Sequence, residues 1–302
     1  MRVFVTGING QLGHDCVGEL MRRGHEAIGS DIQAPTTGVV AYHQLDITDK
    51  GAVIAAMERF HPDAVIHCAA WTAVDAAENP DNRDTVYAVN ALGTRYIAEA
   101  AKIIGAKMMY ISTDYVFDGQ GERPWQPDDK NYAPLNYYGK TKLEGEMAVT
   151  SILEKWYVVR IAWVFGSSPN ARNFIKTMIQ IGKTHDTVRV VNDQIGTPTY
   201  TADLARLLVD MIETEKYGYY HATQSECGPG AYISWADLAE EAYKVAGMDV
   251  KVNRVTTAEY GKSLAARPFN SRLDKSKLVE MGFQPLPDWK DAVRRYLNEA
   301  DL

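Results

Sequence analysis

The first half of the chain alternates short apolar runs with segments whose apolar residues recur at helical spacing. Residues 3–5 form a β-branched and aromatic run, and Cys16, Val17, Leu20 and Met21 then recur with helical periodicity until Gly24. The alternation continues to Ile161. It predicts strands at residues 3–5, 26–31, 63–67, 108–111 and 156–161, and helices at about 16–23, 53–60, 85–104 and 136–148, the second one capped by Thr48 or Asp49.

Strands that alternate with helices are typical of βαβ units and of a parallel sheet with helices on both faces. We therefore predict an α/β fold, with a Rossmann-type doubly wound sheet over residues 1–165. After Gly166, proline, glycine and asparagine become frequent, although helical patterns persist at 173–182, 202–212, 235–245 and 289–297. We assign residues 166–302 mainly to a smaller substrate-binding lobe, with elements near 190–220 returning to the first domain.

Composition narrows the class of protein without changing this fold. The chain has 302 residues, of which 46% are hydrophobic and 24% charged, ordinary values for a globular protein. Its net charge of -7 disfavours nucleic-acid binding, because that binding depends on clustered cations. No secretory signal is visible, and no apolar run approaches the ~18 residues of a membrane span. We therefore expect a cytoplasmic protein with no membrane contact.

The three cysteines are Cys16, Cys68 and Cys227, an odd number at wide spacing. This arrangement favours reduced thiols over a disulfide framework, and it does not resemble the ligand spacing of a zinc site. The pattern itself therefore predicts no metal site.

A glycine-rich segment joins the first predicted strand to the first predicted helix. Gly7, Gly10 and Gly13 follow a G-x-x-G-x-x-G spacing, which is one residue looser than the dinucleotide-binding fingerprint. Glycine permits a tight turn and a close approach of the backbone to a pyrophosphate, and the following helix offers its free N–H groups. We predict that Gly7, Gly10, Gln11, Leu12 and Gly13 bind a dinucleotide.

The end of the second predicted strand carries a candidate for cofactor choice. Asp31 follows Gly13 by 18 residues, where a carboxylate can accept hydrogen bonds from the adenosine ribose hydroxyls. It would repel a 2′-phosphate, and no Arg or Lys directly follows it. We expect NADH to bind well and NADPH to need compensation from elsewhere. Asp46 and Ile47 are candidates for the adenine pocket, although a cap before the next helix explains Asp46 equally well.

Tyr138 and Lys142 lie four residues apart, on one face of a predicted helix. Hydride reduction of a ketone leaves an alkoxide that needs a proton, and a tyrosine can donate it. A nearby ammonium stabilises the phenolate, so we expect Lys142 to lower the pKa of Tyr138. The Thr113 hydroxyl, at the carboxyl end of the fourth predicted strand, can hydrogen-bond the carbonyl oxygen and the phenol together.

With these three elements in place, the chain resembles the extended short-chain dehydrogenase/reductases. The similarity is greatest to those members that reduce the C4 ketone of dTDP-4-dehydro-rhamnose to dTDP-L-rhamnose, a precursor of cell-surface polysaccharides. It runs over nearly the whole chain. The supporting segments are residues 6–13, 67–75, 89–91, 111–119, 134–146, 160–165, 173–174 and 192–199.

The resemblance implies a role for individual residues. Tyr138 would donate the proton, Lys142 would hold the nicotinamide ribose, and Thr113 would bind the sugar carbonyl. Further cofactor contacts would come from Asp31, Asp46, Ile47, Ala70, Trp71, Thr72 and Asn90, although a smaller or polar residue is expected in place of Trp71. Substrate contacts would come from Thr113, Asp114, Trp163, Asn173 and Arg267. For Trp163 a core position, and for Arg267 a plain surface position, are the alternatives.

Other functions within the same fold stay open. A sugar-nucleotide 4,6-dehydratase is disfavoured, because Thr113 is followed by Asp114-Tyr115 and not by an Asp-Glu pair. A sugar-nucleotide epimerase needs little more than the same triad and a tightly held NAD. A non-catalytic regulatory subunit of methionine adenosyltransferase is the third alternative. The sequence leaves open NADH against NADPH, monomer against homodimer, and magnesium, for which no full set of acidic ligands can be matched.

Overall fold

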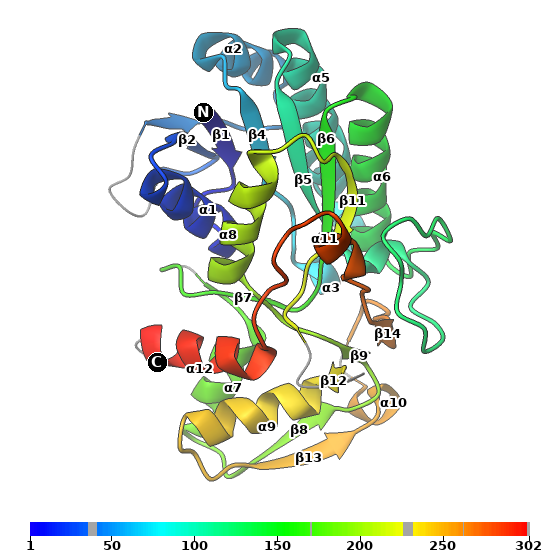
Figure 1. Cartoon of the computed structure of the whole chain (residues 1–302). Helices are drawn as coiled ribbons and strands as arrows, with labels where there is room; N and C mark the ends of the chain where they lie inside the picture. The colour runs from blue at the N-terminus through cyan, green and yellow to red at the C-terminus, as the bar shows by residue number, and fades with distance from the viewer. Residues whose placement is uncertain (36–40, 170, 226–231, 262, 301–302) are drawn as a thin grey trace.

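Seven parallel strands form the main sheet of the molecule (Figure 1). The computed structural model describes residues 1–35, 41–169, 171–225, 232–261 and 263–300, so that Cys227 lies outside the described residues. The strand order is β11-β6-β5-β4-β1-β2-β3. The strands are β1 (Arg2–Thr6), β2 (Glu26–Asp31), β3 (Tyr42–Gln44), β4 (Ala64–His67), β5 (Lys107–Thr113), β6 (Trp156–Ile161) and β11 (Gly218–His221). The doubly wound parallel sheet expected from the sequence is thus confirmed.

Helices cover both faces of this sheet, and each face has its own apolar core. On one face, α1 (Gln11–Arg22) packs against α8 (Thr201–Ile212). On the other, α5 (Thr94–Ile104) packs between α2 (Lys50–Phe60) and α6 (Tyr137–Ile152). Short helical segments precede α5 and α6: α3 (Val74–Ala77), η1 (Pro80–Asn82), α4 (Arg83–Tyr87), η2 (Ala88–Gly93) and η3 (Asp114–Val116). The sheet is therefore buried on both sides, as its continuous apolar strands predict.

A second lobe is built mainly from residues after β6 and lies beyond the carboxyl ends of the strands (Figure 1). Its own core packs helices against a pair of parallel strands. Its helices are α7 (Phe174–Gly182), α9 (Trp235–Val245), α10 (Thr257–Tyr260) and α12 (Trp289–Glu299), whereas α11 (Ser276–Glu280) packs against β11 of the main sheet. Its strands are β7 (Val164–Phe165), β8 (Thr187–Val191), β9 (Ile195–Gly196), β10 (Thr199–Tyr200), β12 (Ile233–Ser234), β13 (Lys251–Val255) and β14 (Asn270–Ser271).

The chain returns from the second lobe to the sheet through α8 and β11. β8, although it lies close to residue 190, pairs with β13 and not with the main sheet. Of the elements near 190–220, α8, which begins at Thr201, and β11 pack on the main sheet. The boundary at residue 165 between the two domains stays a prediction.

One local expectation differs from the structure, one pair of alternatives is decided by it, and one strand was not expected. The helix expected over 85–104 is interrupted by the π-helical turn η2, which widens the backbone around Asn90. Of the two cap candidates, Asp49 caps α2 by accepting from the Ala52 amide, whereas Thr48 bonds Asp46. The strand β3 has no apolar pattern because its side chains are only partly buried at the edge of the sheet.

Among the described helices, none is both long and apolar enough to cross a bilayer.

Candidate active site

A cavity of about 1270 Å³ lies between the carboxyl ends of the sheet strands and the second lobe. This volume exceeds the roughly 300–1,000 Å³ of most small-molecule sites, so it can take two ligands side by side. Nearly all the residues singled out from the sequence line it: Gly7, Gly10, Gln11, Leu12, Gly13, Asp31, Asp46, Ile47, Ala70, Trp71, Thr72, Thr113, Asp114, Tyr138, Lys142, Trp163 and Arg267. Among the described residues, Asn90 and Asn173 are the two candidates that do not line it.

The glycine-rich loop is packed too tightly for any other residue at two of its positions. Gly7 has a φ of +72°, and a Cβ there would lie 2.7 Å from the Ala69 amide nitrogen. A Cβ on Gly13 would lie 2.3 Å from the Gly7 carbonyl oxygen. Gly10, the N-cap of α1, has no side chain to cap the helix, so the first N–H groups of α1 face the cavity uncapped. This geometry fits a bound pyrophosphate.

Asp31 stands at the end of β2, beside this loop. Its Oδ2 accepts a hydrogen bond from the Asn9 amide at 3.0 Å. The carboxylate therefore helps to hold the loop as well as lining the cavity. Asp46 lines the same end, and its Oδ1 accepts hydrogen bonds from the amide and hydroxyl of Thr48.

Asn90 holds one wall of the cavity from behind. It is fully buried, its Oδ1 accepts from the Trp71 amide at 2.8 Å, and its Nδ2 donates to the Trp71 carbonyl and to Thr141. The segment that carries Ala70, Trp71 and Thr72 is thereby fixed to α6. In this structure Asn90 orients the predicted cofactor wall without lining the cavity itself.

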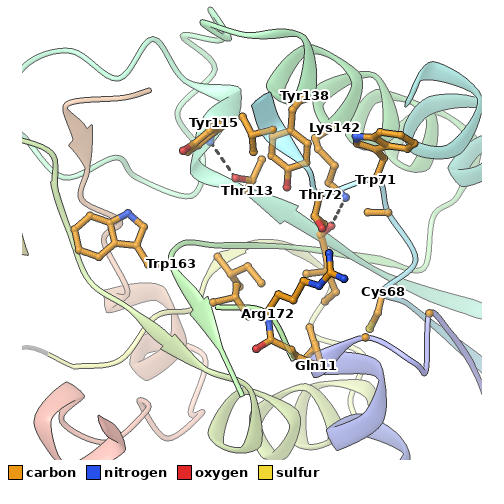
Figure 2. A pocket seen from close by; sticks show the side chains of 18 of the residues that line it. Gln11, Cys68, Trp71, Thr72, Thr113, Tyr115, Tyr138, Lys142, Trp163 and Arg172 are labelled. Atoms are coloured by element: carbon orange, nitrogen blue, oxygen red, sulfur yellow. Dashed lines mark hydrogen bonds between the residues drawn. The ribbon is translucent and has the colours of Figure 1, made fainter. Parts of the chain in front are cut away.

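Tyr138 is placed by the first turn of α6. Asn136 caps this helix by accepting from the Gly139 amide at 2.8 Å, and its Nδ2 donates to the Ala266 carbonyl. A Cβ on Gly139 would lie 2.3 Å from the Tyr115 carbonyl oxygen, so glycine at this position lets the helix end approach η3 closely. The Tyr138 phenol points into the cavity beside Thr113 (Figure 2).

Thr113 is the last residue of β5, and its hydroxyl is held from two sides. Its Oγ1 donates to Asp114 Oδ1 at 3.0 Å and accepts from the Tyr115 amide at 3.2 Å. Asp114 is 2% exposed, and its other oxygen accepts from the Ser271 hydroxyl at 2.5 Å. Burial raises the pKa of Asp114 to about 6, although Ser271 and Thr113 act against this rise. Asp114 thus lines the cavity while orienting Thr113.

The pKa of Tyr138 shifts in the direction opposite to the one we expected. Burial raises it well above the ordinary value, the Asp114 carboxylate raises it further, and the Thr113 hydroxyl lowers it. Lys142 does not offset this rise, because its ammonium donates to the Ile111 carbonyl at 2.7 Å. The expected lowering of the Tyr138 pKa by Lys142 is therefore wrong for this structure. The phenol stays protonated at neutral pH, as a proton donor must be before the reaction.

Lys142 is itself strongly perturbed. It is 3% exposed, and burial lowers its pKa to about 7, whereas Glu146 and Cys68 act in the opposite direction. Its ammonium lies on the cavity wall next to Tyr138 (Figure 2). A lysine that titrates near neutrality in a cleft is typical of a functional group.

Trp163 forms the opposite wall from the second lobe (Figure 2). Its backbone adopts a φ of +51°, which is strained for a residue with a large side chain. Its indole stacks on Trp235, with centroids 4.0 Å apart. The side chain is only half-buried, so one part of it remains open to a ligand.

Arg267 lines the cavity but already has an anionic partner. Its guanidinium makes two hydrogen bonds to the Asp75 carboxylate, at 3.0 and 2.9 Å. The pair lowers the pKa of Asp75. To clamp a phosphate, as the sequence suggested, Arg267 would have to share or exchange this partner.

Asn173, which the sequence suggested as a substrate contact, caps a helix and links the two lobes in the structure. Its Oδ1 caps α7 by accepting from the Lys176 amide, and its Nδ2 donates to Gln11 and Tyr296. Buried behind the cavity wall, it ties the second lobe to the first turn of α1. Its direct contact with substrate stays a prediction.

Two arginines that line the cavity were not identified as site residues from the sequence. Arg172 projects into the cavity (Figure 2), and Arg189 lines it from β8. Within the described residues Arg172 has no ion pair, whereas Arg189 donates to the Glu259 carbonyl. No local pattern marks them, because they are single basic residues far from the glycine-rich loop in sequence. Together with Arg267, three guanidinium groups therefore line the cavity.

The described residues contain no group of three or more His, Cys, Asp or Glu side chains that could hold a metal ion. No position is therefore assigned to the magnesium ion that the resemblance allows.

Comparison with known proteins agrees with this site. The family model described as RmlD substrate binding domain matches residues 1–302. The dTDP-4-dehydrorhamnose reductase of Aggregatibacter actinomycetemcomitans is 38% identical, over 97% of this chain and 97% of that protein. Among crystal structures, a dTDP-4-dehydrorhamnose reductase from Clostridium acetobutylicum superposes with a TM-score of 0.89 at 40% identity, over 99% of both chains.

A second crystal structure bears on the cofactor. The dTDP-4-dehydrorhamnose reductase from Bacillus anthracis, in complex with NADP, superposes with a TM-score of 0.89 at 38% identity and covers 99% of both chains. The resemblance drawn from the sequence is thus confirmed over the whole length. The chain belongs to the RmlD substrate binding domain family.

Proposed function

We propose that this chain reduces the C4 ketone of dTDP-4-dehydro-rhamnose to dTDP-L-rhamnose, using NADH or NADPH. The observation that carries the proposal is that one cavity joins the glycine-rich loop to Thr113, Tyr138 and Lys142. Relatives of nearly the same length, which are named dTDP-4-dehydrorhamnose reductases, support the choice of substrate. The product is a precursor of cell-surface polysaccharides.

The residues of this cavity suit the binding of a nicotinamide dinucleotide. Gly7 and Gly13 allow the loop to pack closely on Ala69 and on its own backbone, and the first turn of α1 would then present uncapped N–H groups to a pyrophosphate. Asp31 would accept hydrogen bonds from the adenosine ribose, and Lys142 would hold the nicotinamide ribose. When bound, the reduced nicotinamide supplies the hydride that attacks C4.

The chain's own residues would then hydrogen-bond and protonate the oxygen at C4. Tyr138 donates its proton to this oxygen as negative charge develops there. Thr113 hydrogen-bonds the same oxygen, for which its hydroxyl has to turn away from Asp114. Lys142, whose ammonium donates to the Ile111 carbonyl, would hold the nicotinamide ribose beside this phenol. The raised pKa of Tyr138 keeps the proton in place until then.

The second lobe would recognise the nucleotide sugar. Trp163 offers a flat apolar face to the ring, and Arg172, Arg189 and Arg267 supply positive charge for a diphosphate. We propose no nucleic acid or membrane as a partner. Monomer and homodimer both remain compatible with this site.

The test is an assay of purified protein with dTDP-4-dehydro-rhamnose and either NADH or NADPH. We expect the cofactor absorbance to fall with substrate and the product to be identified as dTDP-L-rhamnose by NMR. Tyr138→Phe is the control for a reaction at this site. A folded protein that binds either cofactor yet oxidises neither with this substrate would contradict the proposal. Conversion of a nucleotide sugar without net use of NADH would indicate an epimerase instead.

A further inference from the structure

Lys142 poses an electrostatic problem that its hydrogen bond does not solve. It is 3% exposed, and within the described residues it has no ion pair. An ammonium removed from water without a counter-charge is costly and tends to lose its proton. Glu146, one turn further along the same helix, is already bound by Arg160 through two hydrogen bonds of 2.8 Å. Further stabilisation of the charged form has to come from a group that carries no net charge.

The ring of Tyr110 lies directly beneath the ammonium. Tyr110 is fully buried in β5, and its ring centroid is 4.2 Å from Lys142 Nζ. The face of an aromatic ring carries negative electrostatic potential and attracts a cation, most strongly where water is excluded. Ile111, the next residue of β5, provides the carbonyl that accepts from the same ammonium at 2.7 Å. The ammonium therefore contacts two adjacent residues of β5, the ring of Tyr110 and the carbonyl oxygen of Ile111.

The surrounding packing is built around this ring. Gly145 of α6 faces it, and a Cβ on Gly145 would lie 2.3 Å from the Tyr110 hydroxyl oxygen. Glycine at 145 therefore admits the ring between the strand and the helix that carries Lys142. On its other side the ring stacks against His67, with centroids 5.7 Å apart and planes inclined by 25°. The ring cannot move away from Lys142 without breaking this packing.

We propose that Tyr110 is a positioning residue, whose aromatic face holds Lys142 as a charged ammonium in reach of the cofactor ribose and of Tyr138. This role rests on the function proposed above for Lys142, because it deepens that site. Tyr110 acts through Lys142 and touches neither cofactor nor substrate. Its hydroxyl is secondary, since its contact with the Lys142 carbonyl is long, at 3.3 Å.

Other titratable groups face Lys142 from two elements. Glu146 and Tyr138 lie on α6, and Cys68 and His67 lie at the end of β4. Burial and Lys142 lower the pKa of His67 to about 3, so that imidazole is neutral and does not compete for the ring. Glu146 and Cys68 act on Lys142 in the direction that keeps it charged. Neither is changed by a substitution at position 110.

The experiment measures the titration of Lys142 without using the reaction. The protein is labelled with ¹³C at lysine Cε, and the resonance absent from Lys142→Arg is followed by NMR against pH. Tyr110→Phe keeps the ring and removes the hydroxyl. The matched variant carries 3,4,5-trifluorophenylalanine at position 110, which keeps the size of the ring and removes most of the negative potential from its face.

We expect Tyr110→Phe to retain the wild-type midpoint and the trifluoro variant to titrate about one pH unit lower. Fluorescence titration near neutral pH should show weaker NADH binding by the trifluoro variant than by Tyr110→Phe. Equal midpoints in the two variants would overturn the proposal. A lower midpoint in Tyr110→Phe itself would also overturn it, because the hydroxyl would then be responsible. If the reductase assay fails while the midpoints differ, the substrate proposal fails and the role of Tyr110 stands.

Discussion

The carboxylate of Asp31, at the end of β2, accepts a hydrogen bond of 3.0 Å from the backbone amide of Asn9 in the glycine-rich loop. One oxygen atom of a residue predicted to bind ribose is thus already used to hold the loop. The side chain therefore has two separable properties: a hydrogen-bond acceptor that shapes the loop, and a negative charge that faces the cavity.

Substitution of Asp31 should separate these properties. We expect Asp31→Asn to keep the loop contact but lose the charge, so that NADPH gains relative to NADH because a 2′-phosphate is no longer repelled. Asp31→Ala should weaken both cofactors, because the loop contact is lost as well. Both cofactors are titrated against the three proteins by fluorescence. An unchanged NADH to NADPH affinity ratio in both variants would mean that Asp31 does not choose the cofactor.

Tyr138→Phe should lower kcat by about 100-fold or more, the usual scale for the loss of a general acid. NADH affinity should stay nearly constant, because Lys142 and the glycine-rich loop are unchanged. The neighbouring Tyr137→Phe is the matched control, since its hydroxyl donates to the Arg83 carbonyl at 3.3 Å and does not line the cavity. Wild-type turnover in Tyr138→Phe would remove this phenol from the mechanism.

The sequence could predict those site residues whose spacing along the chain is itself diagnostic of a turn or of a helix face. The spacing of Gly7, Gly10 and Gly13 reports a strand-to-helix turn, and the spacing of Tyr138 and Lys142 reports one face of a helix. Both patterns place residues at the carboxyl edge of a parallel sheet, where such folds bind ligands. The sheet topology brings the two patterns to one edge, and the second lobe completes the cavity that joins them.

Residues whose roles depend on distant partners could not be predicted in this way. Asn90 and Asn173 hold Trp71 and Gln11 from behind, and only the fold brings each pair together. The pKa of Tyr138 depends on burial, and the direction of its shift was therefore misjudged. Arg172 enters the cavity from a loop with no pattern of its own.

A pH-dependent contribution to stability should come from Glu19 on α1. Hydrogen bonds from Arg22, and then from Arg23, lower the pKa of Glu19 to about 2. Arg23 donates hydrogen bonds both to Glu19 on α1 and to Asp210 on α8. The Glu19 carboxylate therefore helps to join the two helices. A carboxylate whose folded pKa is lowered stabilises the fold above its unfolded pKa of about 4.5, and this contribution is lost as pH falls towards 2.

We therefore expect Glu19→Gln to lose about 1–2 kcal/mol of unfolding free energy at pH 7, a value that allows for the exposure of Arg22. The deficit should shrink below pH 4.5. Urea unfolding at several pH values measures it. Glu58→Gln, at an exposed position on α2, is the control and should change little. A deficit that is the same at pH 7 and at pH 3 would show that the charge of Glu19 is not its cause.

Trp163 is the residue for which a structural and a functional role can be told apart by one set of variants. Its indole stacks on Trp235 at 4.0 Å, yet the side chain is only half-buried and lines the cavity. If it contacts the sugar, Trp163→Ala should raise KM for the nucleotide sugar and leave NADH affinity nearly unchanged. Trp163→Phe keeps a flat apolar face and should restore part of that KM. If the residue serves only packing, Trp163→Ala should instead cost about 3–5 kcal/mol of stability.

KM, NADH affinity and Tm are measured on one preparation of each variant. A large fall in Tm, with KM unchanged in the protein that remains folded, would decide for packing.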